Sequence, residues 1–165
     1  MRGAIIVTGT PGTGKTTLTK ILEKKGYSVL EVGKIVKDEQ LFDYFDDDRN
    51  SYVVDDDRLN NYLIKLIENH SNNLPLIIEG HVMRLPPSYV LHCVVLRCSI
   101  LNLRQRLLER EYDELKIDEN IEAEIMEVIL TDMLSLYGEE KVTIITTDGT
   151  VEESFNCLLQ EINKK

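Results

Sequence analysis

The sequence predicts an α/β fold in which a five-stranded parallel sheet has helices on both faces. Five short apolar runs indicate strands, at residues 4–7, 28–32, 76–78, 93–96 and 142–146. Most of these runs are not interrupted by polar residues, as expected of strands that are buried on both faces. Helical patterns lie between the runs, and this alternation is typical of a parallel sheet. The 165 residues fit a single domain, without repeats or a linker.

The first predicted strand leads directly into a glycine-rich loop. Residues 9–17 read Gly-Thr-Pro-Gly-Thr-Gly-Lys-Thr-Thr and fit the phosphate-binding pattern G-x-x-x-x-G-K-[S/T]. Glycines let successive backbone N–H groups point at one phosphate, Lys15 can reach the β- and γ-phosphates, and the Thr16 hydroxyl can bind Mg²⁺. A helix beginning near Lys15 would direct its positive end at the same anion. We therefore expect a nucleotide-binding protein, in preference to an ordinary glycine-rich turn.

Three further amphipathic patterns predict the remaining main helices. A stripe from Leu59 to Ile67 indicates one helix, and the acidic residues 55–57 lie where its first turn is expected. A longer stripe runs from residue 117 to residue 133, and a last helix is expected from about residue 151 to residue 162. Such helices can connect parallel strands that a tight turn could not join.

Polar residues follow the predicted strands at one edge of the sheet. Glu79 and His81 follow the third strand, Arg97 ends the fourth, and Asp148 and Gly149 follow the fifth. Open α/β sheets bind ligands at the carboxyl ends of their strands. We therefore expect one site that combines the glycine-rich loop with these segments, with Asp148 and Gly149 among the contacts of ATP.

Three arginines lie in one helical pattern. Arg106 and Arg110 are four residues apart and so share a helix face with each other, with Arg104 nearby. A guanidinium group can bind two phosphate oxygens at once. Arg110 is therefore expected in a lid that clamps the phosphoryl group during transfer. The alternative is a solvated helix face on which the arginines pair with neighbouring acids.

Glu79 and His81 are the candidate acid and histidine of the site. Glu79 ends an apolar strand, where it could hold a metal ion through water, although a surface acid in a turn is the alternative. His81 could orient water or a substrate phosphate, or it could simply be a turn residue. If His81 titrates near its ordinary pKa of about 6.5, activity should fall as pH drops through that region.

The segment from residue 42 to residue 57 combines seven acids with aromatic residues. We expect a solvated acidic loop at residues 46–48. The aromatic rings, Tyr52 among them, could form a second base pocket because rings stack on bases. Asp55 and Asp57 could either cap a helix or contact a substrate.

Composition restricts the partners and the compartment. The formal charge of −10 argues against a broad nucleic-acid groove, which would need a basic face, but it suits a basic protein partner. Three cysteines without a C-x-x-C pair predict free thiols in a reducing compartment. We expect a cytoplasmic protein (nuclear or cytoplasmic in a eukaryote) without a signal peptide or membrane contact.

Several stretches in order along the chain resemble the adenylate kinase isoenzyme 6 family, small nucleoside-monophosphate-kinase-like proteins of archaea and eukaryotic nuclei. The matching stretches are GTPGTGKTT at 9–17, EVGKIVKDEQL at 31–41, SYVVDDD at 51–57, EGH at 79–81, RLLEREY at 106–112 and ENIEAEI at 119–125. The resemblance implies a P-loop NTPase fold of the nucleoside monophosphate kinase type. Residues 31–54 would form the monophosphate-binding insert of this single domain, and residues 109–119 its lid.

The resemblance also implies an activity and a set of site residues. The family is similar to a broad-specificity adenylate kinase that uses Mg-ATP and has ATPase activity. It is implicated in small ribosomal subunit maturation, where it engages a basic ribosomal protein of the pre-ribosomal particle. Residues expected to contact ATP are Gly12, Gly14, Lys15, Thr16, Thr17, Arg110, Asp148 and Gly149. Residues expected to contact the acceptor AMP are Gly33, Lys37, Tyr52, Asp55, Asp57 and Arg106. Lys15, Glu79, His81 and Arg110 would be catalytic, and Thr16 and Glu79 would serve the metal.

Three positions depart from the family pattern. Lys37 stands where the family often has arginine, and Lys34 where it often has aspartate. Lysine binds phosphate as a point charge and lacks the paired geometry of arginine. Glu111 replaces a usual glycine, so the lid hinge is expected to be stiffer.

Three functions are compatible with the sequence. The leading hypothesis is a kinase that moves the γ-phosphoryl group of Mg-ATP to AMP. The second is an ATP-switched ribosome-assembly factor whose physiological activity is ATP hydrolysis. A kinase of a small non-nucleotide metabolite fits the aromatic and acidic insert less well.

Overall fold

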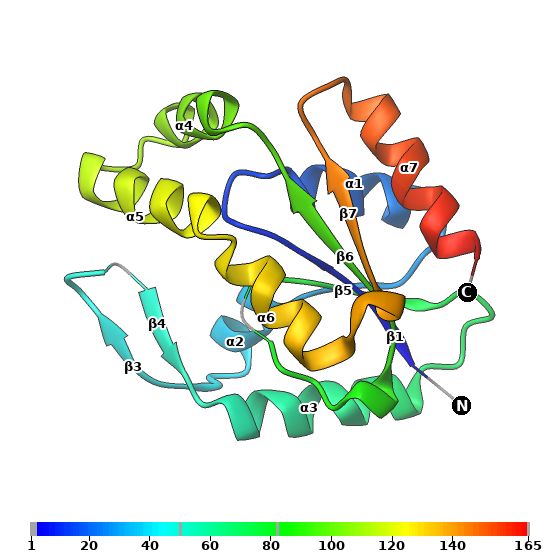
Figure 1. Cartoon of the computed structure of the whole chain (residues 1–165). Coiled ribbons are helices and arrows are strands. Elements are labelled where there is room, and N and C mark those ends of the chain that lie inside the picture. Colours follow the sequence, from blue (N-terminus) through cyan, green and yellow to red (C-terminus); the bar gives the residue numbers. More distant parts are fainter. Residues whose placement is uncertain (1–2, 50, 82, 165) are drawn as a thin grey trace.

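The computed structural model describes residues 3–49, 51–81 and 83–164, and its main sheet has five parallel strands (Figure 1). Their order across the sheet is β2-β5-β1-β6-β7. The bounds are β1 (Ala4–Thr8), β2 (Val29–Glu31), β5 (Leu76–Glu79), β6 (Val90–Arg97) and β7 (Val142–Thr146). The fold class and all five predicted strands are confirmed, with small shifts at the strand ends.

Helices cover both faces of this sheet. The helices of one face are α1 (Lys15–Lys24) and α7 (Val151–Asn163), and those of the other are α2 (Val32–Asp38), α3 (Asp56–Asn69) and α6 (Val128–Tyr137). Each face of the sheet has its own hydrophobic core, and alternate residues of β1 belong to one core or the other. Ile5 and Val7 pack with α1 and α7, while Ala4 and Ile6 pack with the helices of the other face. Alternate residues of a strand face opposite sides, so a central strand covered on both faces must be apolar throughout.

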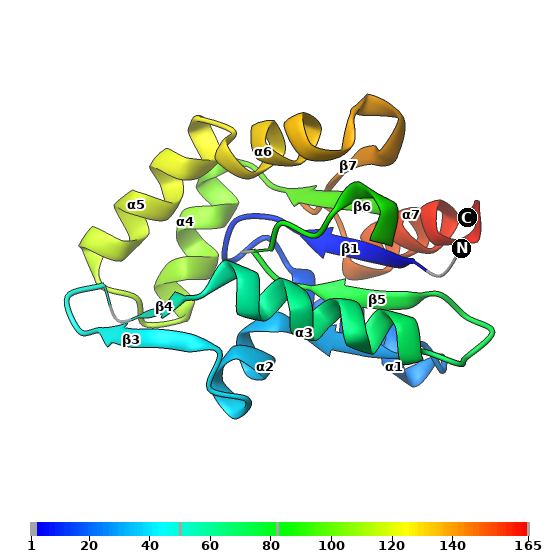
Figure 2. The same ribbon diagram turned by 90° about the horizontal axis from the view of Figure 1, so that it is seen from below.

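Two parts of the chain extend beyond the carboxyl edge of the sheet. One is a hairpin of β3 (Phe42–Asp46) and β4 (Ser51–Val54), and the other is α5 (Glu114–Ile125), which follows α4 (Ile100–Glu109). Figures 1 and 2 show the hairpin and α5 on either side of the loop that follows β1. This arrangement leaves the glycine-rich loop between two projecting walls.

The hairpin was not predicted. Phe42 and Phe45 of β3 pack against Tyr52 of β4, with ring centroids 4.4 Å and 5.0 Å apart, so cross-strand aromatic pairs hold the two strands together. The acidic residues at 47 and 48 lie in the turn, which agrees with the expected solvated loop there, but Asp46 ends β3. A sequence rich in aspartate therefore still forms strands here.

The prediction of one long helical stripe from residue 117 to residue 133 is wrong. α5 ends at Ile125 and α6 begins at Val128, because Glu127 adopts a left-handed conformation with φ of 53°. Non-glycine residues rarely adopt that conformation, so the sequence gives no signal for the break. In the described part of the chain no helix has both the length and the apolar character needed to cross a bilayer.

Glu111 also has a left-handed backbone, with φ of 59°, in the turn between α4 and α5. This is the position at which the resemblance led us to expect glycine. Replacing Glu111 with glycine is expected to raise the free energy of unfolding by about 1 kcal/mol, because a side chain is disfavoured at positive φ. Chemical denaturation would measure the change. An unchanged or lower free energy of unfolding would show that the Glu111 side chain stabilises the turn by more than its backbone costs.

Candidate active site

The glycine-rich loop joins β1 to α1 in the conformation that phosphate binding requires. Gly12 and Gly14 have φ of 96° and 99°, and Gly14 is the residue that caps the N-terminus of α1. A Cβ atom at Gly12 would lie 2.9 Å from a methyl carbon of Leu103, so a side chain there would also collide with α4. Glycine is therefore needed both for the turn and for its close packing against α4.

Lys15 is buried at the centre of the loop, with 8% of its surface exposed. Its ammonium group donates hydrogen bonds to the carbonyl oxygens of Gly9, at 2.7 Å, and Thr10, at 3.1 Å. Burial lowers the pKa of Lys15 to about 8, while the nearby Glu79 carboxylate opposes this shift and the Arg110 charge adds to it. The ammonium is therefore mainly charged at pH 7 and is bonded to backbone carbonyls, for which phosphate oxygens can compete.

Thr16 and Glu79 form the pair expected to serve a metal ion. The Thr16 hydroxyl lies 3.4 Å and 3.3 Å from the two carboxylate oxygens of Glu79. Burial raises the pKa of Glu79, and the charge of Lys15 opposes that shift. Among the described residues no cluster of three or more His, Cys, Asp or Glu side chains could hold a metal ion. One hydroxyl and one carboxylate nevertheless fit Mg²⁺, which keeps several waters and binds substrate phosphates.

Substituting Thr16 with alanine is expected to raise the Mg²⁺ concentration needed for half-maximal activity by about tenfold, with a smaller effect on metal-free ATP binding. The reason is that the hydroxyl binds the metal ion instead of the phosphate. Titrating activity against Mg²⁺ at saturating ATP measures this, with Thr17→Ala on the next residue as comparison. An unchanged Mg²⁺ dependence would leave Glu79 as the metal-holding group.

His81 follows β5 at the border between two cavities of the site. Although the residue is exposed on one side, desolvation by the cavity walls lowers its pKa to about 4, and the positive charges of Lys15 and Lys116 add to the shift. The imidazole is therefore neutral at pH 7, where it can accept or donate a hydrogen bond. The condition for a loss of activity near pH 6.5, a pKa near the ordinary value, is not met, and the sequence alone shows neither the desolvation nor the lysine of α5.

Three adjoining cavities surround the loop. The largest, of about 520 Å³, lies between the loop, the hairpin and α5, and we call it the hairpin cavity. A second, of about 430 Å³, lies between the loop, α4 and the start of α7, and we call it the α7 cavity. A third, of about 170 Å³, lies between them and is lined by Lys15, Thr16, Glu79, His81 and Arg110, among others. We call it the phosphate cavity. Its walls are shared with both neighbours, so ligands in the outer cavities would meet there.

Five of the residues expected to contact ATP line the α7 cavity, namely Gly12, Gly14, Thr17, Arg110 and Gly149. Arg110 also lines the phosphate cavity, as a clamp requires. The Asp148 side chain, by contrast, lines none of the three cavities. One of its carboxylate oxygens accepts hydrogen bonds from the Ser99 backbone N–H and the Asn102 side chain, both at 2.8 Å, and these bonds lower its pKa. Its side chain therefore anchors the start of α4.

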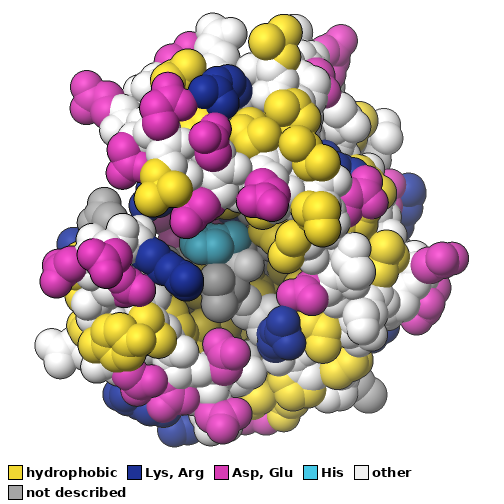
Figure 3. Space-filling view, turned by 60° about the vertical axis from the view of Figure 1, so that its left-hand side comes forward, with side chains coloured by type: hydrophobic (Ala, Val, Ile, Leu, Met, Phe, Trp, Pro, Cys, Tyr) yellow, Lys and Arg dark blue, Asp and Glu magenta, His cyan; other side chains and the backbone are white. Residues whose placement is uncertain are grey.

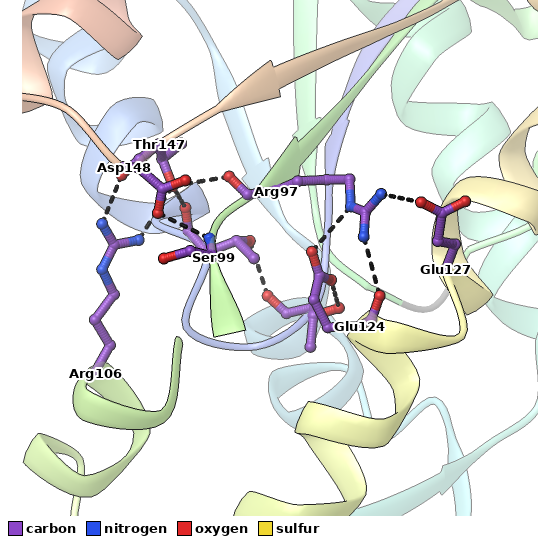
Figure 4. A network of polar contacts seen from close by, with 9 residues as sticks. Arg97, Ser99, Arg106, Glu124, Glu127, Thr147 and Asp148 are labelled. Atoms are coloured by element: carbon purple, nitrogen blue, oxygen red, sulfur yellow. Dashed lines mark hydrogen bonds and ion pairs between the residues drawn. The ribbon is translucent and has the colours of Figure 1, made fainter. Parts of the chain in front are cut away.

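Arg106 lies away from the cavity that the sequence led us to expect. It was predicted to contact the acceptor, but it lines the α7 cavity on the other side of the loop. Its guanidinium donates to the Thr147 carbonyl at 2.6 Å and to the Thr147 hydroxyl at 3.1 Å (Figure 4). The Thr147 hydroxyl in turn donates to the Thr13 carbonyl at 2.7 Å. Arg106 thus braces the glycine-rich loop against the segment that follows β7. Arg110, which caps the end of α4, also lines the α7 cavity, but of these two arginines only Arg110 lines the phosphate cavity as well.

The remaining acceptor predictions divide into two groups. Gly33 and Tyr52 line the hairpin cavity. Lys37 is exposed on α2, outside the walls of the three cavities. Asp55 caps α3 by accepting a hydrogen bond from the Arg58 N–H at 3.0 Å, and Asp57 is exposed in the first turn of the same helix. Asp55 therefore caps a helix, which is one of the two roles, capping or substrate contact, that the sequence left open for it.

The hairpin cavity contains polar residues that sequence reasoning missed. Lys116 and Asn120 of α5, Tyr112 before that helix, and Arg49 of the hairpin turn all line it. Lys116 and Asn120 are four residues apart, a spacing that could have been recognised once a helix was expected there. Two cations facing an apolar floor suit a ligand with a phosphate and a flat ring. Figure 3 shows this face hollowed, with acidic side chains around the rim.

A buried polar network, also missed, connects the loop to α5. Glu124 of α5 is only 4% exposed, and its carboxylate accepts a hydrogen bond from the Thr10 hydroxyl. Arg97 at the end of β6 donates to the Glu124 carboxylate and to the Glu124 carbonyl, each at 3.0 Å, and to the carboxylate of Glu127. Figure 4 shows Arg97 between the two glutamates. Glu124 and Glu127, which has a left-handed backbone, thus both pair with one arginine.

Comparison with known proteins identifies the family. A family model described as an AAA domain matches residues 5–127. The chain is 34% identical over 157 residues to the adenylate kinase isoenzyme 6 homolog of Caenorhabditis elegans, covering 94% of this chain and 85% of that one. It is 36% identical over 147 residues to the adenylate kinase isoenzyme 6 homolog FAP7 of Saccharomyces cerevisiae, covering 87% and 73%. The chain belongs to the adenylate kinase isoenzyme 6 family. This membership confirms the predicted enzyme class, an adenylate kinase-like nucleoside monophosphate kinase.

Solved structures support the fold independently. The shikimate kinase from Bacteroides thetaiotaomicron superimposes with a TM-score of 0.63 at 17% identity, over 99% of each chain. TT1252 from Thermus thermophilus also gives a TM-score of 0.63, at 15% identity, over 99% of this chain and 98% of that one. At these identities the likeness concerns the fold alone, and it confirms the P-loop kinase architecture.

Proposed function

We propose that the protein transfers the γ-phosphoryl group of Mg-ATP to AMP, with tolerance for other nucleoside monophosphates. The observation that carries this proposal is the arrangement of the three cavities. The α7 cavity and the hairpin cavity open on either side of the phosphate cavity, in which Lys15, Glu79, His81 and Arg110 meet. Two nucleotides bound in the outer cavities would direct their phosphates toward each other, as an in-line displacement requires.

The residues of the site have distinct roles in this proposal. ATP occupies the α7 cavity, and its phosphates lie against the backbone N–H groups of the loop and the ammonium of Lys15. Arg110 stabilises charge on the transferring group, and neutral His81 orients the attacking group: its ring N–H donates to the phosphate oxygen of the acceptor, or its other ring nitrogen accepts from a water. Thr16 and Glu79 hold Mg²⁺, which when bound offsets negative charge on the phosphates.

The two projecting walls have separate tasks in the proposal. The insert at residues 31–54 binds the monophosphate, with its ring on the apolar floor beside Tyr52 and its phosphate near Lys116 and Arg49. The lid at residues 109–119 carries Arg110 to the phosphates. Water exclusion by such closure favours transfer to the acceptor over hydrolysis.

Product analysis with and without acceptor tests this function. We expect ADP to form from ATP at a rate that rises with AMP concentration and saturates. Ion-exchange chromatography of the nucleotides measures it. Phosphate release that is independent of AMP, with no rise in ADP formation when AMP is added, would contradict the kinase proposal.

A second candidate, supported by the net charge, is an ATP-switched assembly factor. The formal charge of −10 and the acidic rim in Figure 3 suit a basic partner. In this alternative the partner is a basic small-subunit ribosomal protein of the pre-ribosomal particle, in the cytoplasm or, in a eukaryote, the nucleus. The intrinsic ATPase then serves as a timer in small-subunit maturation. Stimulation of phosphate release by a basic protein in the absence of AMP would favour it, and no response would count against it.

A further inference from the structure

Glu124 differs from the other acids of α5 in its surroundings. The carboxylate is buried, whereas Glu122, two residues earlier on the same helix, is exposed. Burying a carboxylate is costly unless it is paired and hydrogen-bonded. Glu124 satisfies that condition with two partners from two different parts of the fold, Arg97 at the end of β6 and Thr10 in the glycine-rich loop.

Thr10 connects this contact to the reacting phosphates. Its hydroxyl is held by Glu124, while its carbonyl accepts hydrogen bonds from the Lys15 ammonium at 3.1 Å and from the Thr13 hydroxyl at 2.8 Å. A displacement of Thr10 would therefore shift two of the groups that shape the loop. Glu124 is in turn fixed by Arg97, whose strand β6 pairs with β1 just before the loop.

The same helix also forms a wall of the hairpin cavity. Lys116, Asn120 and Ala123 of α5 line it, and Thr10 lines it from the loop side. The contact between Glu124 and Thr10 thus joins the two opposing surfaces between which the acceptor would lie. An aliphatic residue at position 124 could fill the same space. It could not fix the distance between the glycine-rich loop and α5, because it would make no hydrogen bond to Thr10.

We propose that Glu124 is a positioning residue that holds the glycine-rich loop and the α5 wall of the hairpin cavity in register, so that the acceptor is aligned with the phosphates of ATP. The inference rests on the proposed kinase function. It concerns alignment and not binding, because Glu124 lines none of the three cavities and its hydrogen bond to the loop goes to Thr10. The Glu124 charge also acts on Lys15, where it opposes the lowering of the pKa by burial, so the test must separate the charge from the hydrogen bond. Alignment of this kind is sensitive, since a misplacement of about 1 Å can lower a rate by about 100-fold.

The contact can be broken from either side. Glu124→Met removes the hydrogen-bond acceptor but keeps the length of the side chain, and Arg97 retains the backbone carbonyl of residue 124 and Glu127 as partners, so the variant should fold. Glu124→Gln removes the charge but keeps an amide oxygen that can accept from Thr10, and so separates the hydrogen bond from the effect of the charge on Lys15. Thr10→Val removes only the hydroxyl, whereas Thr10→Ser keeps it. We expect Glu124→Met and Thr10→Val each to lower kcat for transfer to AMP by about 10- to 100-fold, with KM for ATP nearly unchanged. Glu124→Gln and Thr10→Ser should each lose less than the change that removes the hydrogen bond, and Glu122→Met should stay within about twofold of wild type.

The double variant decides whether Glu124 acts through Thr10. If it does, Glu124→Met combined with Thr10→Val loses no more activity than the more damaging single change. Titration with a non-hydrolysable ATP analogue, expected to bind one per chain, separates misalignment from loss of folded protein. Losses that multiply in the double variant, a Glu124→Met protein that transfers normally, or losses explained by reduced binding stoichiometry would each overturn the inference. A wild-type protein that transfers nothing to AMP would instead contradict the proposed function itself.

Discussion

Replacing Lys15 with alanine is expected to lower kcat for phosphoryl transfer by about 100- to 1000-fold, the scale on which other preorganised charged or polar groups contribute. Lys15 is the buried cation at the centre of the loop, and it lies in the phosphate cavity. Without the Lys15 ammonium, the negative charge on the β- and γ-phosphates is no longer neutralised by a lysine. ATP hydrolysis without acceptor should fall with transfer, because both reactions break the same bond.

Lys20→Ala provides the matched control, since Lys20 lies on the same helix but is exposed. It should leave kcat nearly unchanged. The pKa of about 8 adds a second test in the free protein. The charged form is lost as pH rises through that value, so kcat/KM for ATP should fall above about pH 8 in wild type. A Lys15→Ala variant that keeps most of its turnover would contradict the assignment of the phosphate loop.

Changing His81 to alanine is expected to lower kcat by about 100-fold while the KM for ATP changes little. His81 lies between the hairpin and phosphate cavities, where the phosphate oxygen of the acceptor or a water would approach the γ-phosphate. A group used mainly in the transition state lowers kcat without weakening ATP binding. Steady-state kinetics with ATP varied at saturating AMP would measure both parameters.

The pH dependence gives His81 a separate signature. With a pKa lowered to about 4, the imidazole stays neutral as pH falls from 8 to about 5, so kcat/KM should not drop near 6.5. It should fall below about pH 5 as the ring becomes protonated, and the alanine variant should lack that part of the profile. His70, at the C-terminal end of α3, serves as a control position. Normal turnover of the His81→Ala variant at every pH would show that His81 is only a turn residue.

Features that depend on short stretches of sequence were predictable. The loop at residues 9–17 could be recognised because its glycines and Lys15 act through local backbone geometry. The five strands could be recognised because burial on both faces demands uninterrupted apolar runs. Placing Glu79 and His81 at the same edge followed from parallel topology alone.

Features that depend on contacts between distant segments were not predictable. The hairpin was hidden because its acidic composition is typical of a loop, and cross-strand rings outweigh that tendency. The break at Glu127 gives no local signal, because glutamate rarely adopts a left-handed backbone, and the partner of its carboxylate is Arg97, 30 residues earlier. Spacing put Arg106 and Arg110 on one helix face, but only the path of α4 shows that Arg106 reaches the segment that follows β7. Glu124 looks like a surface acid until the loop is placed against it.

The central claim is that the γ-phosphoryl group passes directly from ATP to AMP across the phosphate cavity. Following ATP labelled in its γ-phosphate through a single turnover with unlabelled AMP tests this most directly. The arrangement of Lys15, Glu79, His81 and Arg110 between two cavities predicts that most of the label appears in ADP. Label found only in inorganic phosphate, at a rate that AMP does not change, would contradict the claim.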